Sequence, residues 1–168
     1  QGSILVGAAY SGGYIYRIDT RLGIVNDAPG TSPKQEAVVE AIHRPRVGLA
    51  LSDGFTCLFS GYGGYGVVGA GMAVYDVRTG KTDVLENKDL LPHHGILAMA
   101  ELPDGNVLCG STVIPHGGAL PVHDTAALFE FHPATRTIGR VMYPFEGEKE
   151  IAHIVGVGDI IYGITASG

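Results

Sequence analysis

The stretch that decides the fold runs from Gly95 to Tyr143 and reads GILAMAELPDGNVLCGSTVIPHGGALPVHDTAALFEFHPATRTIGRVMY. It contains four short runs of β-forming residues, at positions 96–102, 107–112, 126–132 and 137–143. Between the first two runs stands Asp104-Gly105, a dipeptide that hairpin turns favour, and a Pro133–Arg136 turn separates the last two. Four such runs in series predict an antiparallel meander of four strands.

This meander recurs along the chain. Its second strand ends in glycine at four places, namely Gly7, Gly61, Gly110 and Gly163, which are spaced by about 50 residues. Its third strand recurs at positions 14–19, 72–76 and 127–132. A period of about 50 residues with four strands per repeat is typical of propeller blades, because one twisted sheet covers both of its faces only when further sheets stack on it.

With this pattern the chain resembles the β-propeller superfamily of Kelch-like and YVTN-like repeats. The shared features are a strand, Asp-Gly, a strand ending in glycine, a loop, an aromatic strand such as Leu128–Phe131, and a turn such as Thr79-Gly80. The resemblance covers almost the whole chain and implies an all-β fold, a β-propeller segment of four-stranded antiparallel blades with about three blades. We predict a single segment over residues 1–168, with blade parts at 4–27, 46–86, 95–143 and 151–166. Because propellers host lyases, hydrolases, lectins and scaffolds, the resemblance implies an architecture rather than an activity.

Composition excludes several classes of protein. The chain has 168 residues, a length that suits one domain, and its 45% hydrophobic and 17% charged residues argue against disorder. A formal net charge of −6 argues against general binding of nucleic acid. No apolar run reaches the roughly 18–20 residues of a membrane helix, so we expect neither nucleic acid nor a membrane as a partner. Cys57 and Cys109 are predicted to be small buried core residues, with a disulfide or a reactive thiol as the alternative.

The number of blades raises a question of closure. The repeat predicts two full blades, a first blade without its first strand, and a last blade with only its first two strands. Closed propellers have roughly four to eight blades. We therefore expect the chain either to pair with a second copy of itself, giving a ring of about six blades, or to form part of a longer propeller.

Three further segments carry local signals of their own. Residues 23–27 are expected to finish the first blade, and Ser32-Pro33 with Gln35 is typical of a helix start, which predicts a short helix over 33–43. A strand over 37–42 is the alternative. The run 61–66 matches G-x-G-x-x-G, but a strand at 72–76 follows it instead of a helix, so we predict a glycine-rich loop rather than a dinucleotide site.

The candidate site lies where connecting loops of a propeller meet. Loops from a fourth strand to the next first strand, and from a second to a third strand, surround the mouth of the central channel on one face. These loops carry most of the histidines and a charged run at 146–150. The candidate catalytic residues are His93, His94, His123 and Arg46, and the candidate substrate-binding residues are Tyr62, Tyr65, His116 and Arg44. The loop 113–125 is longer than its counterpart at 11–13, so we expect its histidines and Asp124 to approach His93 or His94.

Two chemistries suit these residue types. In the first, a histidine acts as general acid or base while an arginine neutralises a carboxylate and a tyrosine assists. This set is similar to that of propeller-fold polysaccharide lyases, although no contiguous motif carries a catalytic residue over. In the second, histidines bind a metal, which is disfavoured because the neighbours His93 and His94 would point to opposite faces of a strand and no H-E-x-x-H or C-x-x-C pattern occurs.

We therefore expect no metal and no cofactor. The predicted function is recognition or processing of a carbohydrate polymer at the channel mouth, and a non-catalytic interaction scaffold is the alternative. Simpler roles remain open for the same residues. The histidines can be ordinary polar loop residues, Arg44 and Arg46 can pair with Glu36 or Glu40, and Asp19 and Asp76 are expected to cap turns.

Overall fold

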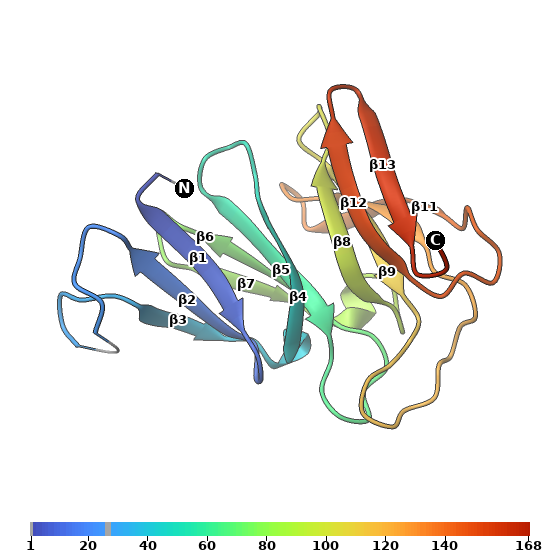
Figure 1. The fold of residues 1–168 in the computed structure, drawn as a ribbon, viewed down its shortest axis with the longest axis horizontal. Coiled ribbons are helices and arrows are strands. Elements are labelled where there is room, and N and C mark those ends of the chain that lie inside the picture. The colour runs from blue at the N-terminus through green and yellow to red at the C-terminus, as the bar shows by residue number, and fades with distance from the viewer. Residues whose placement is uncertain (1, 26–27) are drawn as a thin grey trace.

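A computed structural model describes residues 2–25 and 28–168, so Asp27, where the sequence places the end of the first blade, lies outside the described residues. The described strands form four antiparallel sheets that follow one another along the chain (Figure 1). Sheet 1 contains β1 (Ile4–Ala9), β2 (Tyr14–Asp19) and β3 (Lys34–Val38), and sheet 2 contains β4 (Arg44–Ala50), β5 (Thr56–Tyr62), β6 (Met72–Asp76) and β7 (Thr82–Leu85). Sheet 3 contains β8 (Gly95–Glu101), β9 (Val107–Thr112), β10 (Leu128–His132) and β11 (Thr137–Met142), and sheet 4 contains β12 (Ile151–Val157) and β13 (Ile160–Thr165). Two short 3-10 helices, η1 (Glu40–Ile42) and η2 (Asn87–Asp89), precede β4 and β8.

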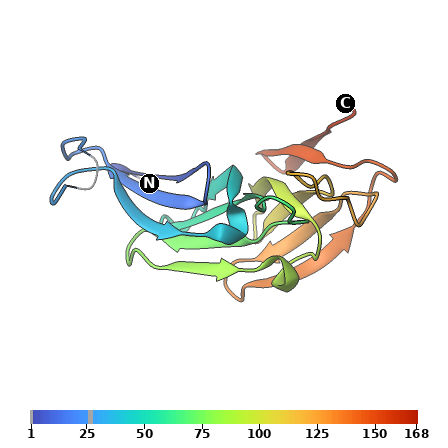
Figure 2. The same ribbon diagram turned by 90° about the horizontal axis from the view of Figure 1, so that it is seen from below.

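The strand order confirms the predicted meanders. In sheets 2 and 3 every strand pairs with its neighbours in sequence, in the orders β4-β5-β6-β7 and β8-β9-β10-β11. The first sheet starts at the position of a second strand, and the last described sheet has the first two strands. Sheet 1 lies at one end of the row and sheet 4 at the other, in both views (Figures 1 and 2). The chain is thus an all-β segment of antiparallel blades, and its described residues form an open row of sheets.

Strand β5 shows why the sheets stack. All of its residues, from Thr56 to Tyr62, are buried, because sheet 2 lies between two other sheets. Cys57 and Phe59 pack with Ile15 of sheet 1, whereas Leu58 packs with Phe129 of sheet 3. A strand covered on both faces reads as a nearly continuous apolar run instead of an alternating one.

Two apolar clusters hold the first three sheets together. The cluster between sheets 1 and 2 includes Tyr75, and the cluster between sheets 2 and 3 includes Phe131; both side chains are fully buried. Cys57 belongs to the first cluster and Cys109 to the second, and both are free thiols whose pKa is raised by burial. The prediction that the cysteines are buried core residues is confirmed.

The helix predicted over residues 33–43 is wrong. Residues 34–38 form strand β3, which pairs with β2 and supplies the outer strand of the first sheet. In the described residues β3 finishes the first sheet, whereas in the expected stretch 23–27 the described residues 23–25 contribute a bridge between Ile24 and Ser32. Ser32 does not cap a helix but accepts a hydrogen bond from the Asp19 backbone N–H at 2.8 Å. Pairing with β2 outweighed the local start signal, and only η1 retains helical turns in this region.

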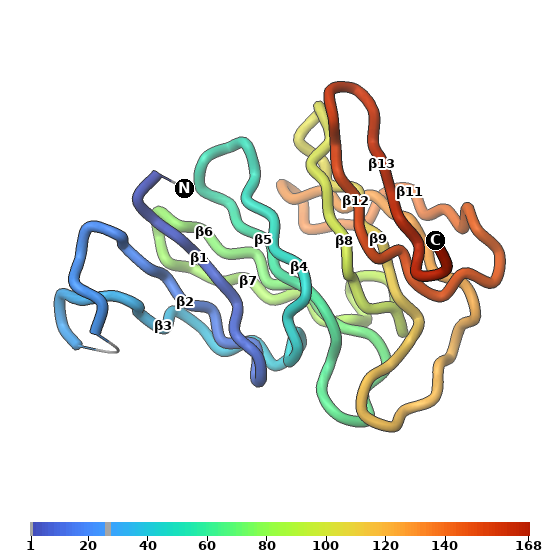
Figure 3. The backbone as a smooth tube through the Cα atoms, in the orientation of Figure 1, coloured from blue at the N-terminus to red at the C-terminus, as the bar shows by residue number. Residues whose placement is uncertain are grey.

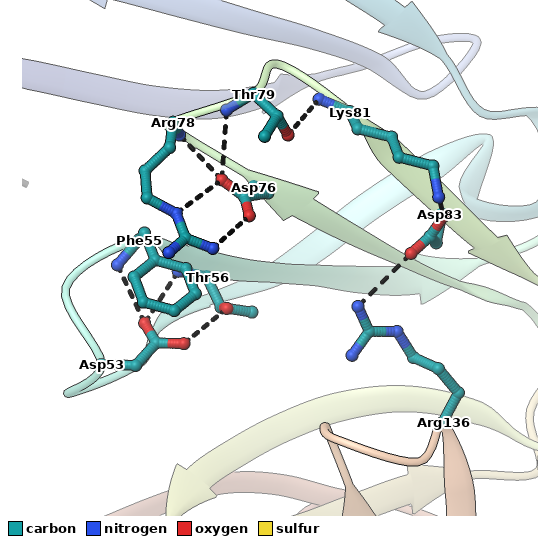
Figure 4. A network of polar contacts seen from close by, with 9 residues as sticks. All are labelled: Asp53, Phe55, Thr56, Asp76, Arg78, Thr79, Lys81, Asp83 and Arg136. Carbon is teal, nitrogen blue, oxygen red and sulfur yellow. Dashed lines mark hydrogen bonds and ion pairs between the residues drawn. The ribbon is translucent and has the colours of Figure 1, made fainter.

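The turns at the outer ends of the sheets are tied by charged side chains (Figure 4). Asp76 accepts a 2.8 Å hydrogen bond from the Arg78 backbone N–H, which confirms its predicted role, and the Arg78 side chain lowers the pKa of Asp76 to about 2. The Arg78 guanidinium in turn lies 3.3 Å from the centre of the Phe55 ring. Arg136 reaches from sheet 3 to Asp83 of sheet 2 at 3.3 Å, so one ion pair joins neighbouring sheets at their outer strands.

Sheet 4 covers only part of sheet 3. A groove of about 1140 Å³ lies beside it, lined by glycines, polar and charged loop residues and apolar side chains, among them Leu108, Leu128, Phe145, Ile151, Ile154 and Ile161. In the described part of the chain, no helix has the length and apolar character needed to cross a membrane.

The recurring glycines stand at the strand ends for different reasons. A Cβ atom on Gly61 would lie 2.2 Å from the carbonyl oxygen of Arg44, and one on Gly110 would lie 2.7 Å from the Ile151 side chain of sheet 4. Gly7 has open space around it. Only two of these three glycines are therefore required by close packing.

We expect Gly61→Ala to lower the free energy of unfolding by about 1–3 kcal/mol, because the clash is with backbone that cannot move aside locally. Urea denaturation followed by circular dichroism measures this change. Gly7→Ala is the matched control and should change the free energy by no more than about 0.5 kcal/mol. Equal effects of the two substitutions would contradict the assigned packing of β4 against β5.

Candidate functional site

Four connections meet along one side of the row of sheets, at the same end of their strands. The loop between β5 and β6 and the long loop between β9 and β10 descend together (Figure 3), and the Gly66 N–H donates to the Gly117 carbonyl oxygen at 3.2 Å. The connection from sheet 3 to sheet 4 joins them, since the Ala126 N–H donates to the Glu148 carbonyl at 2.7 Å. The connection from sheet 2 to sheet 3 is tied in through Asn87, as described below. The sequence-predicted site residues lie in this region.

Three of the predicted histidines form one cluster with Tyr143. The rings of His94 and His123 are stacked, with centroids 4.9 Å apart and planes at 30°. His93 lies 5.9 Å from His123, and Tyr143 lies 6.5 Å from His94, between ring centroids. The expectation that the long loop brings a histidine to His93 or His94 is confirmed for His123. We call these four residues the histidine cluster.

His94 is the buried member of the histidine cluster. Its Nδ1 lies 2.9 Å from Ser111 Oγ, and this oxygen accepts a hydrogen bond from the Ala127 N–H at 2.7 Å. We assign the Ser111 proton to the bond with Nδ1, which leaves the His94 proton on Nε2. Burial, and then the neighbouring His123 and His93, lower the pKa of His94 to about 4. His94 is therefore a neutral imidazole at physiological pH, and the buried Ser111 hydroxyl orients it.

Asn87 holds the turn that carries the two adjacent histidines. His93 has a left-handed backbone (φ 65°), and its N–H donates to Asn87 Oδ1 at 2.7 Å. The two N–H groups of Asn87 Nδ2 are shared among the carbonyl oxygens of Ala70, Leu91 and His94, which lie 3.0, 3.2 and 2.8 Å from the nitrogen. One amide group thus fixes the glycine-rich loop and the histidine turn in a common position. No local pattern indicates this role, since Asn87 is one polar residue in a polar connection.

Arg46 and Tyr62 line a second, smaller site. This inner pocket has a volume of about 270 Å³ and lies against the first strands of sheets 2, 3 and 4; its lining residues are Pro45, Arg46, Tyr62, Leu97, Glu150, Ala152 and His153. The Arg46 guanidinium carbon lies 6.0 Å from the centre of the Tyr62 ring. The pocket therefore combines a guanidinium, a carboxylate, a phenol and an imidazole.

Glu150 connects this inner pocket to three sheets. Its Oε2 accepts hydrogen bonds from the hydroxyls of Tyr62 at 3.1 Å and Thr112 at 2.8 Å, which come from sheets 2 and 3, while Glu150 itself precedes β12 of sheet 4. Burial and the Glu150 carboxylate raise the pKa of Tyr62 to about 12, so Tyr62 is a neutral hydrogen-bond donor. Sequence reasoning noted only a charged loop at 146–150 and did not single out Glu150.

The remaining predicted residues pack around Tyr62 and Tyr65. His116 lies edge-on to Tyr62, with centroids 4.0 Å apart and an angle of 89°. The Arg44 guanidinium lies 4.3 Å from the centre of the Tyr65 ring. Neither Arg44 nor Arg46 forms an ion pair with Glu36 or Glu40 in the described part of the chain, and Glu36 pairs with Lys34 at 3.1 Å. The arginines thus lie over aromatic rings instead of carboxylates.

A third feature, the outer pocket, adjoins the histidine cluster. It has a volume of about 420 Å³ and is lined by His123, Asp124, Thr125, Tyr143 and Glu146. Asp124 therefore shares a pocket with His123, as the sequence suggested. Among the described residues, no group of three or more His, Cys, Asp or Glu side chains is placed to hold a metal ion.

No protein-family model matches the chain, and a search of the curated proteins finds no match either.

We expect the stability of the fold to decrease as the pH falls from about 6.5 to about 4, because the unfolded chain binds a proton at His94 in that range and the folded chain does not. A loss on the order of 2 kcal/mol is expected from this residue. Urea unfolding measured at several pH values tests it. In His94→Gln the slope over this range should be smaller, whereas Val84→Thr, at an exposed position of β7, should keep the wild-type slope.

We also expect Glu150→Ala to destabilise the fold by about 1–3 kcal/mol, since it leaves the hydroxyls of Tyr62 and Thr112 without their acceptor. Glu150→Gln keeps an acceptor oxygen and should retain at least half of the lost stability. Thermal unfolding of the three proteins compares them. An Ala variant as stable as wild type would show that Glu150 does not join the sheets.

Proposed function

We propose that this chain recognises or processes a carbohydrate polymer on the face that carries the histidine cluster, the outer pocket and the inner pocket. The observation that carries the proposal is the convergence, on this one face, of two polar pockets flanked by exposed aromatic rings. Tyr65 and Tyr143 are 74% and 56% exposed. Tyrosine presents a broad apolar ring with a polar hydroxyl at its tip, a combination that suits a sugar, which has apolar ring faces and hydroxyl edges.

The polar groups supply directional contacts for sugar hydroxyls. Asp124 and Glu146 in the outer pocket and Glu150 in the inner pocket are acceptors when ionised, and Arg46 is a donor. A pocket with a few convergent polar groups is the usual form of a small-ligand site. Two such pockets on one face suit a chain of sugar units better than a single small molecule.

Processing would use the groups whose protonation is set by their surroundings. His94 is a neutral imidazole with its proton on Nε2, and Tyr62 stays protonated, so both would act as hydrogen-bond donors. Ser111 is fully buried and holds His94 in place, so we assign it an orienting role and no role as a nucleophile.

A non-catalytic interaction scaffold is the second candidate. The observation that favours it is the number of large apolar side chains left exposed at both ends of the row of sheets, among them Leu5, Val38, Val155 and Tyr162. Scaffold binding through those surfaces would not need the histidine cluster.

Binding of a panel of neutral, acidic and amino-bearing oligosaccharides, measured by isothermal titration calorimetry, tests the proposal. For a saccharide that binds, Tyr143→Ala and Tyr65→Ala should each weaken binding about tenfold, which corresponds to the loss of about 1.4 kcal/mol of contact. Val84→Ala on β7 serves as the control and should bind as wild type does. The proposal fails if no member of the panel binds, or if binding is unchanged in both tyrosine variants.

A further inference from the structure

We infer that the inner pocket takes a small unit that carries a carboxylate and an ammonium group together. The inference rests on the proposed function, under which this unit is one sugar of a carbohydrate polymer, and it names the charges that this sugar carries. A free amino acid has the same two groups, so the experiment compares the two sources.

Three β-bulges build the inner pocket. Near the start of β4, β8 and β12, the residues on either side of one position pair with adjacent residues of the second strand, so the residue between them is extra. These extra residues are Arg46, Leu97 and Ala152, and all three line the inner pocket. A bulge redirects side chains of its strand and is over-represented beside active sites. The first strands of three successive sheets therefore share one device that directs side chains to this pocket.

Two opposite charges line the inner pocket without pairing with each other. Arg46 is exposed, and in the described part of the chain it forms no ion pair. Its guanidinium carbon lies 6.0 Å from the centre of the Tyr62 ring, while the Tyr62 hydroxyl donates to Glu150 at 3.1 Å. Tyr62 thus contacts the cation with its ring and the anion with its hydroxyl, and both charges remain in the lining of the pocket.

Glu150 is fixed by one of its two carboxylate oxygens. Its Oε2 accepts hydrogen bonds from the hydroxyls of Tyr62 and Thr112, whereas its Oε1 accepts none from any residue that the structure describes. An ammonium group can donate to this free oxygen, and the planar guanidinium of Arg46 can hold a carboxylate with two parallel hydrogen bonds. The pocket therefore offers an acceptor for a cation and a donor for an anion.

The two charges select for a unit that carries both groups. An anion alone at Arg46 would share the pocket with the Glu150 carboxylate, and a cation alone at Glu150 would share it with the guanidinium. Like charges brought together in this way are costly, and such contacts are how charged sites reject the wrong partner. A unit with a carboxylate and an ammonium group pairs with both residues and leaves neither charge uncompensated.

The size and the walls of the inner pocket suit one small unit. Its volume of about 270 Å³ is below the roughly 300–1,000 Å³ of pockets that hold drug-sized ligands. Pro45, Leu97 and Ala152 supply an apolar wall, and His153 adds a polar group. A single sugar ring has apolar faces for such a wall and hydroxyl groups for the imidazole.

Four monosaccharides, each as its methyl glycoside, test the inference by isothermal titration calorimetry. Glucosaminuronic acid carries both groups, glucuronic acid lacks the ammonium group, glucosamine lacks the carboxylate, and glucose lacks both. Wild type should bind glucosaminuronic acid about tenfold more tightly than either singly charged sugar, because one more charged hydrogen bond forms. Glycine and alanine, titrated in the same way, represent the free amino acid.

Two conservative variants connect each group of the ligand to one residue. In Arg46→Gln the preference over glucosamine should disappear, while the preference over glucuronic acid should stay about tenfold. In Glu150→Gln the reverse is expected. Arg140→Gln, at an exposed position of β11 outside the pocket, is the matched control and should bind as wild type does. Circular dichroism spectra equal to wild type establish that each variant is folded.

The results separate this inference from the proposed function. Equal binding of glucosaminuronic acid and either singly charged sugar, or unchanged preferences in Arg46→Gln, would overturn the inference, as would a lack of binding by every probe. The carbohydrate proposal would still stand in these cases if the tyrosine variants weaken oligosaccharide binding. Amino acids that bind with the same dependence on Arg46 and Glu150, while no sugar binds, would support the two-charge pocket and overturn a sugar as the source of its ligand.

Discussion

The structure depends on one constraint: a twisted sheet with apolar residues on both faces must be covered on both faces. Sheet 2 satisfies it, and β5, buried along its whole length, is the clearest sign. Cys57 and Phe59 pack against sheet 1, and Leu58 packs against sheet 3, so the burial of sheet 2 depends on both of its neighbours. The order of the sheets along the chain follows, because each meander is short and the next meander is the nearest available cover.

The site follows from the same stacking. In sheets 2 and 3 the loop between the second and third strands and the connection to the next sheet lie at the same end of the strands, and stacking brings these connections within reach of each other. Hydrogen bonds to buried or half-buried groups then fix them, as Asn87 fixes the histidine turn and Glu150 receives the hydroxyls of Tyr62 and Thr112. The charged side chains that join the outer strands, Arg136 with Asp83, lie at the opposite ends of the sheets and leave the site untouched.

Much of this arrangement was predictable from sequence. The period of glycine-ended strands predicted the meanders and the partial sheets at both ends, because strand periodicity and turn residues are local signals. The same signals located the loops, and hence His94, His123 and Tyr62. They failed at residues 33–43. Ser32-Pro33 is typical of a helix start, but residues 34–38 form strand β3 and pair with the edge of β2. They also missed Asn87, Ser111 and Glu150, whose roles arise from contacts with segments distant in sequence and leave no local pattern.

The end of β9 has a consequence for the two pockets. Neighbouring residues of a strand point to opposite faces, and here Ser111 holds His94 while Thr112 holds Glu150. The histidine cluster and the inner pocket are therefore each held by one of two adjacent residues of β9. A displacement of the end of β9 would therefore move the histidine cluster and the inner pocket together, so the positions of the two sites are coupled.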